Sequence, residues 1–265
     1  MGLKTVQLNC RRTIHGSNAV IAVSNFTNSQ IHRLCQSKPT NTHLIPNGTD
    51  IEYFKPIDKN QEGNLREKYN IKKTSLILLT LARVIPRKGH DVVIKALPQI
   101  VKVIPNIIYL IAGPENLKWK IELTKIASEL RVENHIRFLG YVTDQEKLDL
   151  YQICDTYIMV SKNADLDGDS EGFGITFLEA NACGKPVIGS NTDGIPDAVE
   201  NSVSGLLVEP NNVDQTVEAI IKLLSNHKLR TKMGELARKR VENHFTWDHV
   251  VTEIRDLIDN RAFIL

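Results

Sequence analysis

The sequence predicts an α/β fold built on a Rossmann-like, doubly wound parallel sheet, and three observations support this prediction. Short apolar runs alternate with longer stretches of helical periodicity along most of the 265 residues, as in sheets that helices cover on both faces. Runs such as Leu76–Ala82 and Ile107–Ala112 are almost entirely apolar rather than alternating, which is typical of strands buried on both sides. The last third has apolar residues at three- and four-residue spacing, which indicates amphipathic covering helices.

The individual elements follow from the same patterns. Apolar runs bounded by turn residues are expected as strands at Ala19–Val23, His43–Ile45, Leu76–Ala82, Ile107–Ala112, Ile136–Leu139, Tyr157–Val160, Pro186–Gly189 and Gly205–Val208. Segments with helical periodicity are expected as helices at Phe26–Gln36, Gly63–Tyr69, His90–Val103, Trp119–Glu129, Asp144–Gln152, Ile175–Ala182 and Ile195–Glu200. Three further helices, at Val213–Leu224, Lys228–Asn243 and Trp247–Asp259, end the chain.

The first part of the chain differs from the rest. Residues 1–44 are expected to hold only one strand and one helix, and the turn-rich segment Pro46-Asn47-Gly48-Thr49-Asp50 then leads into a continuous α/β region. We therefore divide the chain into a short first unit over residues 1–44, a main domain over 45–245 and a final helix over 246–265.

Composition narrows the class of protein. Hydrophobic residues make up 42% and charged residues 24% of the chain, with a net charge of +2. This charge is too small to indicate nucleic-acid binding. The cysteines lack a Cys-x-x-Cys pair and predict reduced thiols in a cytosolic protein. Because neither a membrane-length apolar stretch nor the apolar core of a secretory signal is found, we expect a cytoplasmic location.

The segment Glu171-Gly172-Phe173-Gly174 opens a predicted helix and places carboxylates at Glu171 and Glu179, eight residues apart. On helical spacing both carboxylates would lie on roughly the same face and look into one cleft. Glycines at the helix start would let a phosphate approach the backbone N–H groups of the first turn. The alternative is an N-cap acid followed by an ordinary buried-edge glutamate, and spacing alone does not separate the two.

A cationic loop follows the strand at Leu76–Ala82. It carries Arg83, Arg87 and Lys88, at the carboxyl end of a strand, where open α/β sheets bind ligands. Arg83 can pair with two phosphate oxygens and Lys88 can add a point charge. Taken alone, a solvated basic loop is the better interpretation. The glycine-opened helix across the same sheet edge favours a site for a diphosphate.

Other motifs fail as sites. The run Asp165-Leu166-Asp167-Gly168-Asp169 resembles the start of a calcium loop, but Ser170 and Thr176 stand where an EF-hand needs Gly and Glu. We interpret these acids as a polar lip beside the site. The histidines show no metal-binding spacing, no Gly-x-Ser-x-Gly is present, and Phe177 replaces the third glycine of a dinucleotide motif. A bound metal is therefore not required.

Taken together, these motifs resemble the retaining glycosyltransferases of family 4, whose GT-B fold has two facing Rossmann-like domains. The resemblance covers about residues 16 to 259. Its ordered motifs are Val23-Ser24, Ile45-Pro46-Asn47-Gly48-Thr49-Asp50 with Phe54 and Pro56, Arg83 with Lys88-Gly89, Ala112-Gly113-Pro114, Phe138-Leu139-Gly140, Glu171 to Glu179, Gly184-Lys185-Pro186-Val187-Ile188 and Gly205-Leu206-Leu207-Val208.

The resemblance implies a donor site in the main domain. Its catalytic residues would be Arg83 and Lys88, which would hold the diphosphate and stabilise the leaving group, and Glu171, which would bond hydroxyls of the donor sugar. The donor-binding residues would be Glu179 at the ribose, the backbone of Phe173, Gly174 and Ile175 at the sugar and phosphates, and Gly140, Tyr141 and Val142 beside the base. No metal or other cofactor is implied, because fixed cations and helix N–H groups stabilise the leaving group.

Two departures from the family stand out. Asp193 precedes Gly194-Ile195-Pro196 where members often have Gly-Gly, so a carboxylate would intrude there and the donor specificity stays open. Nearly all of the N-terminal, acceptor-binding domain is also absent. Residues 1–44 resemble only its last strand and helix, and the final helix would present its apolar side to solvent or to another copy.

We therefore expect the donor-binding half of a retaining hexosyltransferase, which moves a sugar from a UDP-, GDP- or ADP-sugar to a glycan or lipid acceptor. A separate chain would supply the acceptor domain, and the complex would lie in the cytoplasm or at the inner membrane face. The residues leave open a noncatalytic nucleotide-sugar binding module or a truncated, inactive enzyme. A nucleotide-sugar epimerase has only the fold in its favour.

Overall fold

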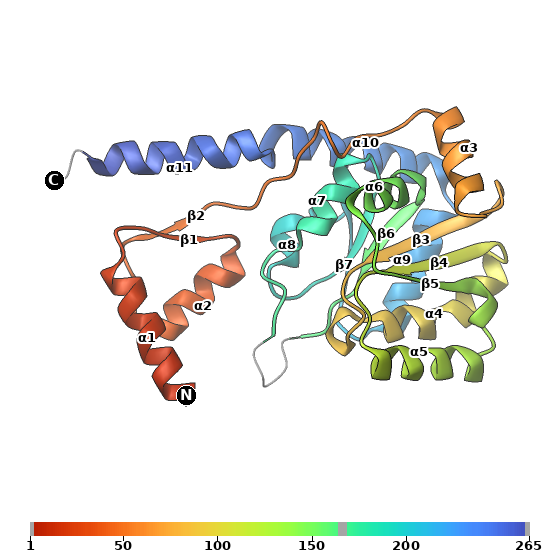
Figure 1. Cartoon of the computed structure of the whole chain (residues 1–265), viewed down its shortest axis with the longest axis horizontal. Helices are drawn as coiled ribbons and strands as arrows, with labels where there is room; N and C mark the ends of the chain where they lie inside the picture. Colours follow the sequence, from red (N-terminus) through yellow and green to blue (C-terminus); the bar gives the residue numbers. More distant parts are fainter. Residues whose placement is uncertain (1–2, 164–168, 263–265) are drawn as a thin grey trace.

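The computed structural model describes residues 3–163 and 169–262. It contains a six-stranded parallel sheet and a smaller two-stranded parallel sheet, which lie in two units side by side (Figure 1). The six strands are β3 (Leu76–Leu81), β4 (Ile107–Ala112), β5 (Ile136–Gly140), β6 (Thr156–Met159), β7 (Val187–Ser190) and β8 (Gly205–Val208).

The order of these strands creates a switch point. They lie in the order β5-β4-β3-β6-β7-β8, so the chain runs outward from β3 to β5, returns to β6 beside β3, and then runs outward in the other direction. The loops that leave β3 and β6 therefore diverge. In doubly wound sheets, ligands bind in the crevice outside the carboxyl ends of the strands at this point.

Helices cover both faces of the large sheet. On one face lie α4 (His90–Val103), α5 (Leu117–Glu129) and α9 (Val213–Leu224), and on the other α3 (Lys59–Lys68), α6 (Asp144–Ile153) and α7 (Ile175–Ala182). The helix α10 (His227–His244) packs against α7 and α9, and the short α8 (Ile195–Ala198) follows β7. Single-turn 3-10 helices η1 (Pro86–Lys88) and η2 (Glu133–His135) complete this unit.

Strand β3 illustrates why the apolar runs are unbroken. Ile77 and Leu79 pack into the core beside α6 and α7, whereas Leu78 packs into the core beside α4 and α9. All three are fully buried. Because successive side chains of a strand point to opposite faces, a sheet covered on both sides needs apolar residues at every position.

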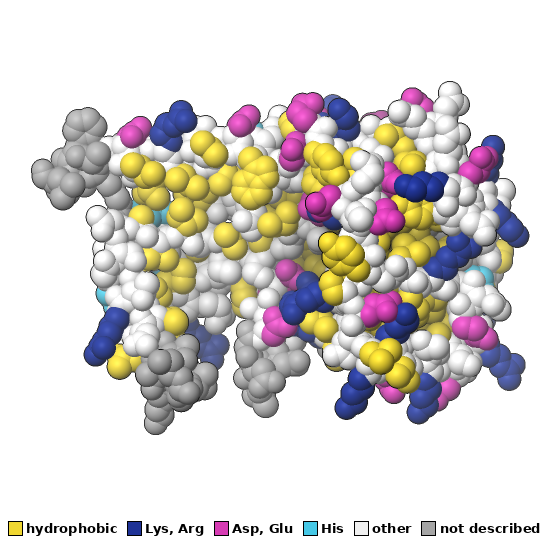
Figure 2. Space-filling model, viewed as in Figure 1, with side chains coloured by type: hydrophobic (Ala, Val, Ile, Leu, Met, Phe, Trp, Pro, Cys, Tyr) yellow, Lys and Arg dark blue, Asp and Glu magenta, His cyan; other side chains and the backbone are white. Residues whose placement is uncertain are grey.

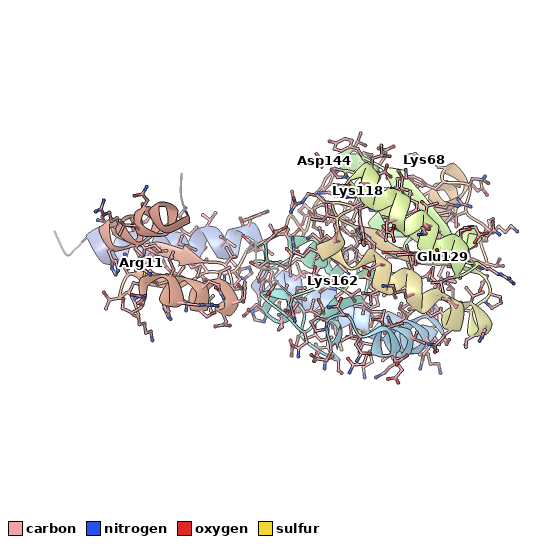
Figure 3. All side chains as sticks on the ribbon, turned by 90° about the horizontal axis from the view of Figure 1, so that it is seen from below. Arg11, Lys68, Lys118, Glu129, Asp144 and Lys162 are labelled. Atoms are coloured by element: carbon pink, nitrogen blue, oxygen red, sulfur yellow. The ribbon has the colours of Figure 1, made fainter. Side chains whose placement is uncertain are left out.

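The smaller unit comprises α1 (Leu3–Gly16), β1 (Val20–Ala22), α2 (Asn25–Cys35) and β2 (Thr42–Leu44), and α11 (Trp247–Ala262) runs back over it (Figure 1). Figure 3, seen from below, shows the same unit extending away from the large sheet. The chain passes between the units twice, and the two passages touch where Thr49 N–H donates to the Phe245 carbonyl at 2.8 Å.

Every expected strand and helix is confirmed, with boundaries that differ by a few residues. The prediction of one strand and one helix in residues 1–44 is wrong, because α1 precedes β1 and β2 begins at Thr42. Apolar residues recur in α1 at three- and four-residue spacing, at Leu3, Val6, Cys10 and Ile14, so this helix was readable from the sequence. Polar contacts also tie it in place. The Arg11 Nε donates to the Leu34 carbonyl, and the Asn41 amide donates to the Ile14 carbonyl at 2.9 Å. The cysteines Cys10, Cys35, Cys154 and Cys183 are unpaired, as predicted.

Candidate functional site

A cavity of about 350 Å³ lies at the switch point of the large sheet. Its walls come from the end of β3 and the loop after it, including Arg83 and Lys88, and from the segment Glu171–Thr176 that leads into α7. Val23 and Asn47, which follow β1 and β2, line it from the smaller unit. The cavity therefore lies between the two units, at the position where the strand order predicts a ligand.

The loop after β3 is held tightly on the end of β6. Gly89 follows η1 in a left-handed conformation, with φ of 72°, and a Cβ there would lie 1.9 Å from the Val160 carbonyl oxygen. Only glycine fits such a close backbone approach. The Lys88 Nζ consequently lies 3.5 Å from the Met159 sulfur, at the end of β6.

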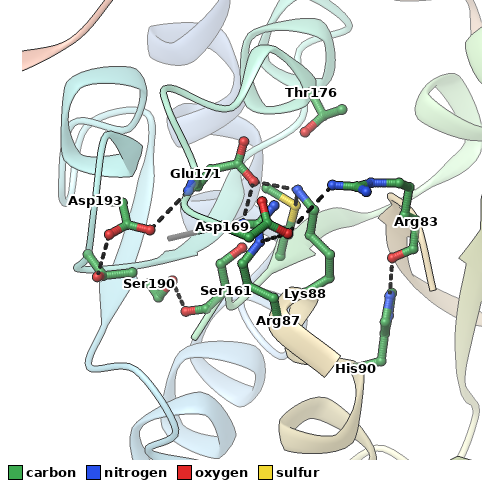
Figure 4. A network of polar contacts seen from close by, with 12 residues as sticks. Arg83, Arg87, Lys88, His90, Ser161, Asp169, Glu171, Thr176, Ser190 and Asp193 are labelled. Carbon is green, nitrogen blue, oxygen red and sulfur yellow. Dashed lines mark hydrogen bonds and ion pairs between the residues drawn. The ribbon is translucent and has the colours of Figure 1, made fainter. Parts of the chain in front are cut away.

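Cations from this loop meet acids from the loop after β6 (Figure 4). The Lys88 Nζ donates to a Glu171 carboxylate oxygen. The Arg87 Nη1 lies 3.4 Å from the same oxygen, and the Arg87 Nε lies 3.1 Å from an Asp169 carboxylate oxygen. An Arg83 nitrogen lies 3.8 Å from that Asp169 oxygen. We call these five residues the ion cluster.

Members of the ion cluster differ in exposure. The Arg87 side chain is 6% exposed and that of Lys88 is 11% exposed, whereas that of Arg83 is 59% exposed. Burial lowers the pKa of Lys88, while the Glu171 carboxylate opposes this by favouring the charged amine. Lys88 is thus a desolvated cation whose charge depends on a nearby anion.

A separate contact holds the Glu171 backbone. Its N–H donates to the Asp193 carboxylate at 2.9 Å, and its carbonyl accepts from the Gly194 N–H at 2.9 Å. A Cβ on Gly194 would lie 2.0 Å from the Gly172 carbonyl oxygen. The expectation that the Asp193 carboxylate intrudes at the site is therefore corrected, because this carboxylate instead fixes the segment that carries Glu171.

Helix α7 begins at the cavity wall. Gly174 adopts a left-handed conformation, with φ of 93°, directly before the helix. A Cβ there would lie 2.7 Å from the Phe177 ring, so glycine is required for the sharp entry into α7. Gly174, Ile175 and Thr176 line the cavity, which places the positive end of the α7 dipole at its wall.

Glu179 lies apart from this cavity. It is 8% exposed, and its carboxylate accepts from the Tyr151 hydroxyl at 2.8 Å and from the Lys147 Nζ at 3.1 Å, both on α6. It does not line the cavity that Glu171 lines. The two carboxylates thus face different partners. The ribose role predicted for Glu179 stays a prediction.

The predicted base-binding stretch lies at the same sheet edge, two strands from β3. Gly140 ends β5 with φ of 71°, and Tyr141 is 77% exposed. Neither they nor Val142 line the cavity. Of the residues that the sequence predicted for the site, Arg83, Lys88, Glu171, Phe173, Gly174 and Ile175 line this one cavity, and sequence reasoning gave no role to Arg87. The only signal for Arg87 was its position among three cations of one loop.

The described residues offer neither a metal site nor a membrane-spanning helix. Part of the predicted acidic lip, residues 165–168, lies outside the described residues, and Asp169 belongs to the ion cluster. Among the residues that the structure describes, no three His, Cys, Asp or Glu side chains gather as a metal site. None of the described helices has both the length and the apolar character needed to span a bilayer.

Solved structures place this arrangement in a known fold. Anabaena HepE, in complex with UDP and glucose, superposes with a TM-score of 0.84 at 23% identity, over 96% of this chain and 67% of that one. The C-terminal domain of a Francisella tularensis group 1 glycosyltransferase gives 0.66 at 24% identity, over 75% of this chain and 99% of that domain. The fold and site thus define an α/β protein of the GT-B type.

Sequence comparison gives the family. Residues 61–240 match the family profile "Glycosyl transferases group 1", and the chain belongs to this family. The chain is 31% identical over 238 residues to a GDP-mannose-dependent monoacylated alpha-(1-6)-phosphatidylinositol monomannoside mannosyltransferase of Corynebacterium glutamicum, covering 90% of this chain and 61% of the relative.

A second relative agrees. A GDP-mannose-dependent alpha-(1-6)-phosphatidylinositol monomannoside mannosyltransferase of Mycobacterium tuberculosis is 30% identical over 248 residues, covering 94% of this chain and 63% of the relative. The chain thus spans about three fifths of the length of these curated relatives. The family resemblance predicted from the sequence is confirmed.

Proposed function

We propose that the chain is the donor-binding half of a retaining glycosyltransferase, which transfers a sugar from a nucleoside-diphosphate sugar to a glycan or lipid acceptor. The observation that supports this most is the cavity at the switch point, where Arg83, Lys88 and Glu171 meet the start of α7. Cations suit a diphosphate, and a carboxylate beside them suits sugar hydroxyls.

The proposed chemistry breaks the bond between the anomeric carbon and the β-phosphate oxygen. An acceptor hydroxyl oxygen forms the new bond to this carbon, the bonding electrons leave with the nucleoside diphosphate, and the hydroxyl proton passes to the leaving phosphate. Arg83, Lys88 and the first turn of α7 would stabilise the growing negative charge. Each such interaction is worth about 3 kcal/mol in comparable sites. Because these cations neutralise the leaving group, we propose that transfer needs no divalent metal.

The relatives' names guide the choice of donor. Two relatives at 30% and 31% identity are named as GDP-mannose-dependent, whereas HepE was crystallised with UDP and glucose. We propose GDP-mannose as the first donor to test, followed by UDP- and ADP-sugars. The base specificity would come from the predicted stretch Gly140-Tyr141-Val142, at the same edge of the sheet.

The smaller unit presents an apolar face that suits a partner. Trp247, Val251 and Ile258 lie along α11 and are 46%, 51% and 61% exposed, while Ile21 on β1 and Leu44 on β2 are 41% and 40% exposed. Figure 2 shows apolar side chains gathered along α11 and over the two short strands. Exposed apolar faces of this kind mark interaction sites.

A further α/β unit fits this face, because its strands can pair with the edges of the small sheet. The sheet of β1 and β2 has only two strands, and a two-stranded sheet is marginal unless further strands extend it. The curated relatives are longer than this chain. We propose that a further α/β unit contributes parallel strands beside β1 and β2, covers α11 and completes the cleft that binds the acceptor.

A transfer assay tests this function. The chain is incubated with GDP-mannose, UDP-glucose or an ADP-sugar and with lipid and glycan acceptors, in the presence of EDTA, with and without a candidate partner chain. Formation of glycosylated acceptor, lost in the Lys88→Gln variant, supports the proposal. Saturable donor binding without transfer under every condition would favour the rival reading, a noncatalytic nucleotide-sugar binding module.

A further inference from the structure

Arg87 holds a different position in the ion cluster from the other two cations. Arg83 and Lys88 line the cavity, as does Glu171, but Arg87 does not. Its side chain is the most buried of the three cations, at 6% exposed. Its Nη1 contacts Glu171 and its Nε contacts Asp169 (Figure 4).

Arg87 is also anchored by its backbone. Its carbonyl accepts from the Lys162 N–H at 2.8 Å, which ties η1 to the segment that follows β6. The Glu171 backbone is fixed independently by the Asp193 carboxylate at 2.9 Å. The Glu171 N–H therefore binds Asp193, and its carboxylate binds Arg87 and Lys88.

We propose that Arg87 is a positioning residue, which keeps the Glu171 carboxylate directed at the donor sugar when the donor diphosphate becomes the partner of Lys88. This inference rests on the proposed function. Lys88 faces the cavity and can turn to a phosphate, whereas Arg87 lies outside the cavity and keeps its carboxylate partners. Lys88 is thus the exchangeable partner of Glu171, and Arg87 is the permanent one.

Charge explains why a permanent partner is needed. The Glu171 side chain is 14% exposed, and a buried carboxylate that loses its counter-charge pays a large desolvation penalty or takes up a proton. With Arg87 in place, Glu171 keeps a buried counter-charge after Lys88 leaves it. A guanidinium is suited to this role because its charge is spread over several nitrogens, so that Nη1 lies near Glu171 while Nε lies near Asp169.

The inference predicts the sugar preference of the site, defined as the ratio of the Kd for a nucleoside diphosphate to the Kd for its sugar conjugate. We would measure it with GDP and GDP-mannose and with UDP and UDP-glucose. Arg87→Gln should lower this ratio about tenfold, comparable to the loss of a hydrogen bond to a charged group. Glu171→Gln should lower it to a similar extent, and Arg87→Lys should keep part of it.

A double variant separates positioning from general damage. In the Glu171→Gln background, Arg87→Gln should cause no further loss of sugar preference, because Arg87 acts through Glu171. An equal loss in both backgrounds, or an unchanged ratio in the Arg87→Gln single variant, would overturn the inference.

Lys118→Gln, which removes an exposed cation on α5 (Figure 3), is the control for charge removal. If Arg87→Gln does not fold, a full wild-type ratio in Arg87→Lys would also overturn it. Failure of the wild-type chain to bind any nucleotide or sugar conjugate would instead contradict the proposed function.

Discussion

The Lys88 ammonium group donates a hydrogen bond to the carboxylate of Glu171, which lies 83 residues further along the chain. The two residues lie in the loops that follow β3 and β6, which are adjacent strands. The pair therefore joins the two loops that diverge at the switch point of the sheet. Under the proposed function, a diphosphate would compete with Glu171 for Lys88, and the predictions below follow from this competition and from the way the loops are fixed.

Glu171→Gln is expected to weaken binding of the sugar conjugate but not binding of the bare nucleotide. Without the carboxylate, Lys88 has no internal anion to give up, so bare GDP or UDP should bind about as well as to the wild type or a few times more tightly. The sugar conjugate should lose about tenfold in affinity relative to the bare nucleotide, because a carboxylate is the stronger acceptor for sugar hydroxyls. Calorimetric titration with both ligands measures this. Equal effects on the two ligands would contradict the proposed contact between Glu171 and the donor sugar.

Nucleotide binding at alkaline pH is expected to take up protons through Lys88. Burial lowers the pKa of Lys88 from its ordinary value, and a bound phosphate should raise it again. Between the two pKa values the amine is partly deprotonated before binding and protonated after it, so each binding event draws protons from the buffer.

Titrations in buffers of different ionisation enthalpy detect this uptake. It should appear only as the pH rises toward the lowered pKa, and it should vanish in Lys88→Gln. Uptake of the same size in the variant would assign the protons to another group.

His90 is expected to make the protein sensitive to acid. Burial lowers its pKa to about 4, and its Nε2 lies 3.2 Å from the Arg83 carbonyl. As the pH falls from about 6.5 to about 4, the unfolded chain binds a proton at this residue and the folded chain does not, so stability falls. The free energy of unfolding falls by roughly 3 kcal/mol in total by the time the pH is below the folded-state pKa. Above the unfolded-state pKa His90 causes no loss.

Denaturant unfolding across this pH range measures the effect. His90→Gln should show a shallower loss of stability between these values than the wild type, whatever its stability at neutral pH. His227→Gln, at an exposed position, should keep the wild-type slope. An identical slope in wild type and His90→Gln would contradict the assignment.

Gly89→Ala is expected to destabilise the loop that carries Arg87 and Lys88. Its φ of 72° and the 1.9 Å approach of a Cβ to the Val160 carbonyl oxygen both oppose a side chain. Gly140→Ala is a matched control, since Gly140 has a similar φ of 71° but nothing within 4 Å of its Cβ. The control should lose about 1 kcal/mol from backbone strain. Gly89→Ala should lose clearly more stability than this control. Similar losses in the two variants would mean that the backbone at Val160 moves aside at little cost.

The sequence predicted the sheet well for a physical reason. Strands buried on both faces need unbroken apolar runs, and β3, with Ile77 and Leu78 packed on opposite faces, is readable for that reason. The ends of parallel strands share one edge, so the cations after β3 and the acid after β6 could be brought together without knowing the strand order.

Other features depend on contacts that spacing does not encode. Helical spacing from Glu171 to Glu179 failed to place both in the cavity, because α7 begins only at Ile175 and the periodicity does not extend back to Glu171. The burial of Arg87 depends on the turn of η1, and the role of Asp193 depends on its left-handed φ of 52°. Such turns are set by tertiary packing rather than by residue type.

The most direct test of the central claim is a calorimetric titration of the chain with UDP, GDP, ADP and their hexose conjugates, repeated on Lys88→Gln. We predict saturable binding of one nucleotide series, weakened about tenfold to a hundredfold in the variant by the loss of a charged contact to phosphate. Thermal unfolding should show that the variant stays folded, because Arg87 still pairs with Glu171. Absence of binding to every nucleotide, or equal affinity in wild type and variant, would contradict the assignment of this cavity to a nucleoside-diphosphate sugar.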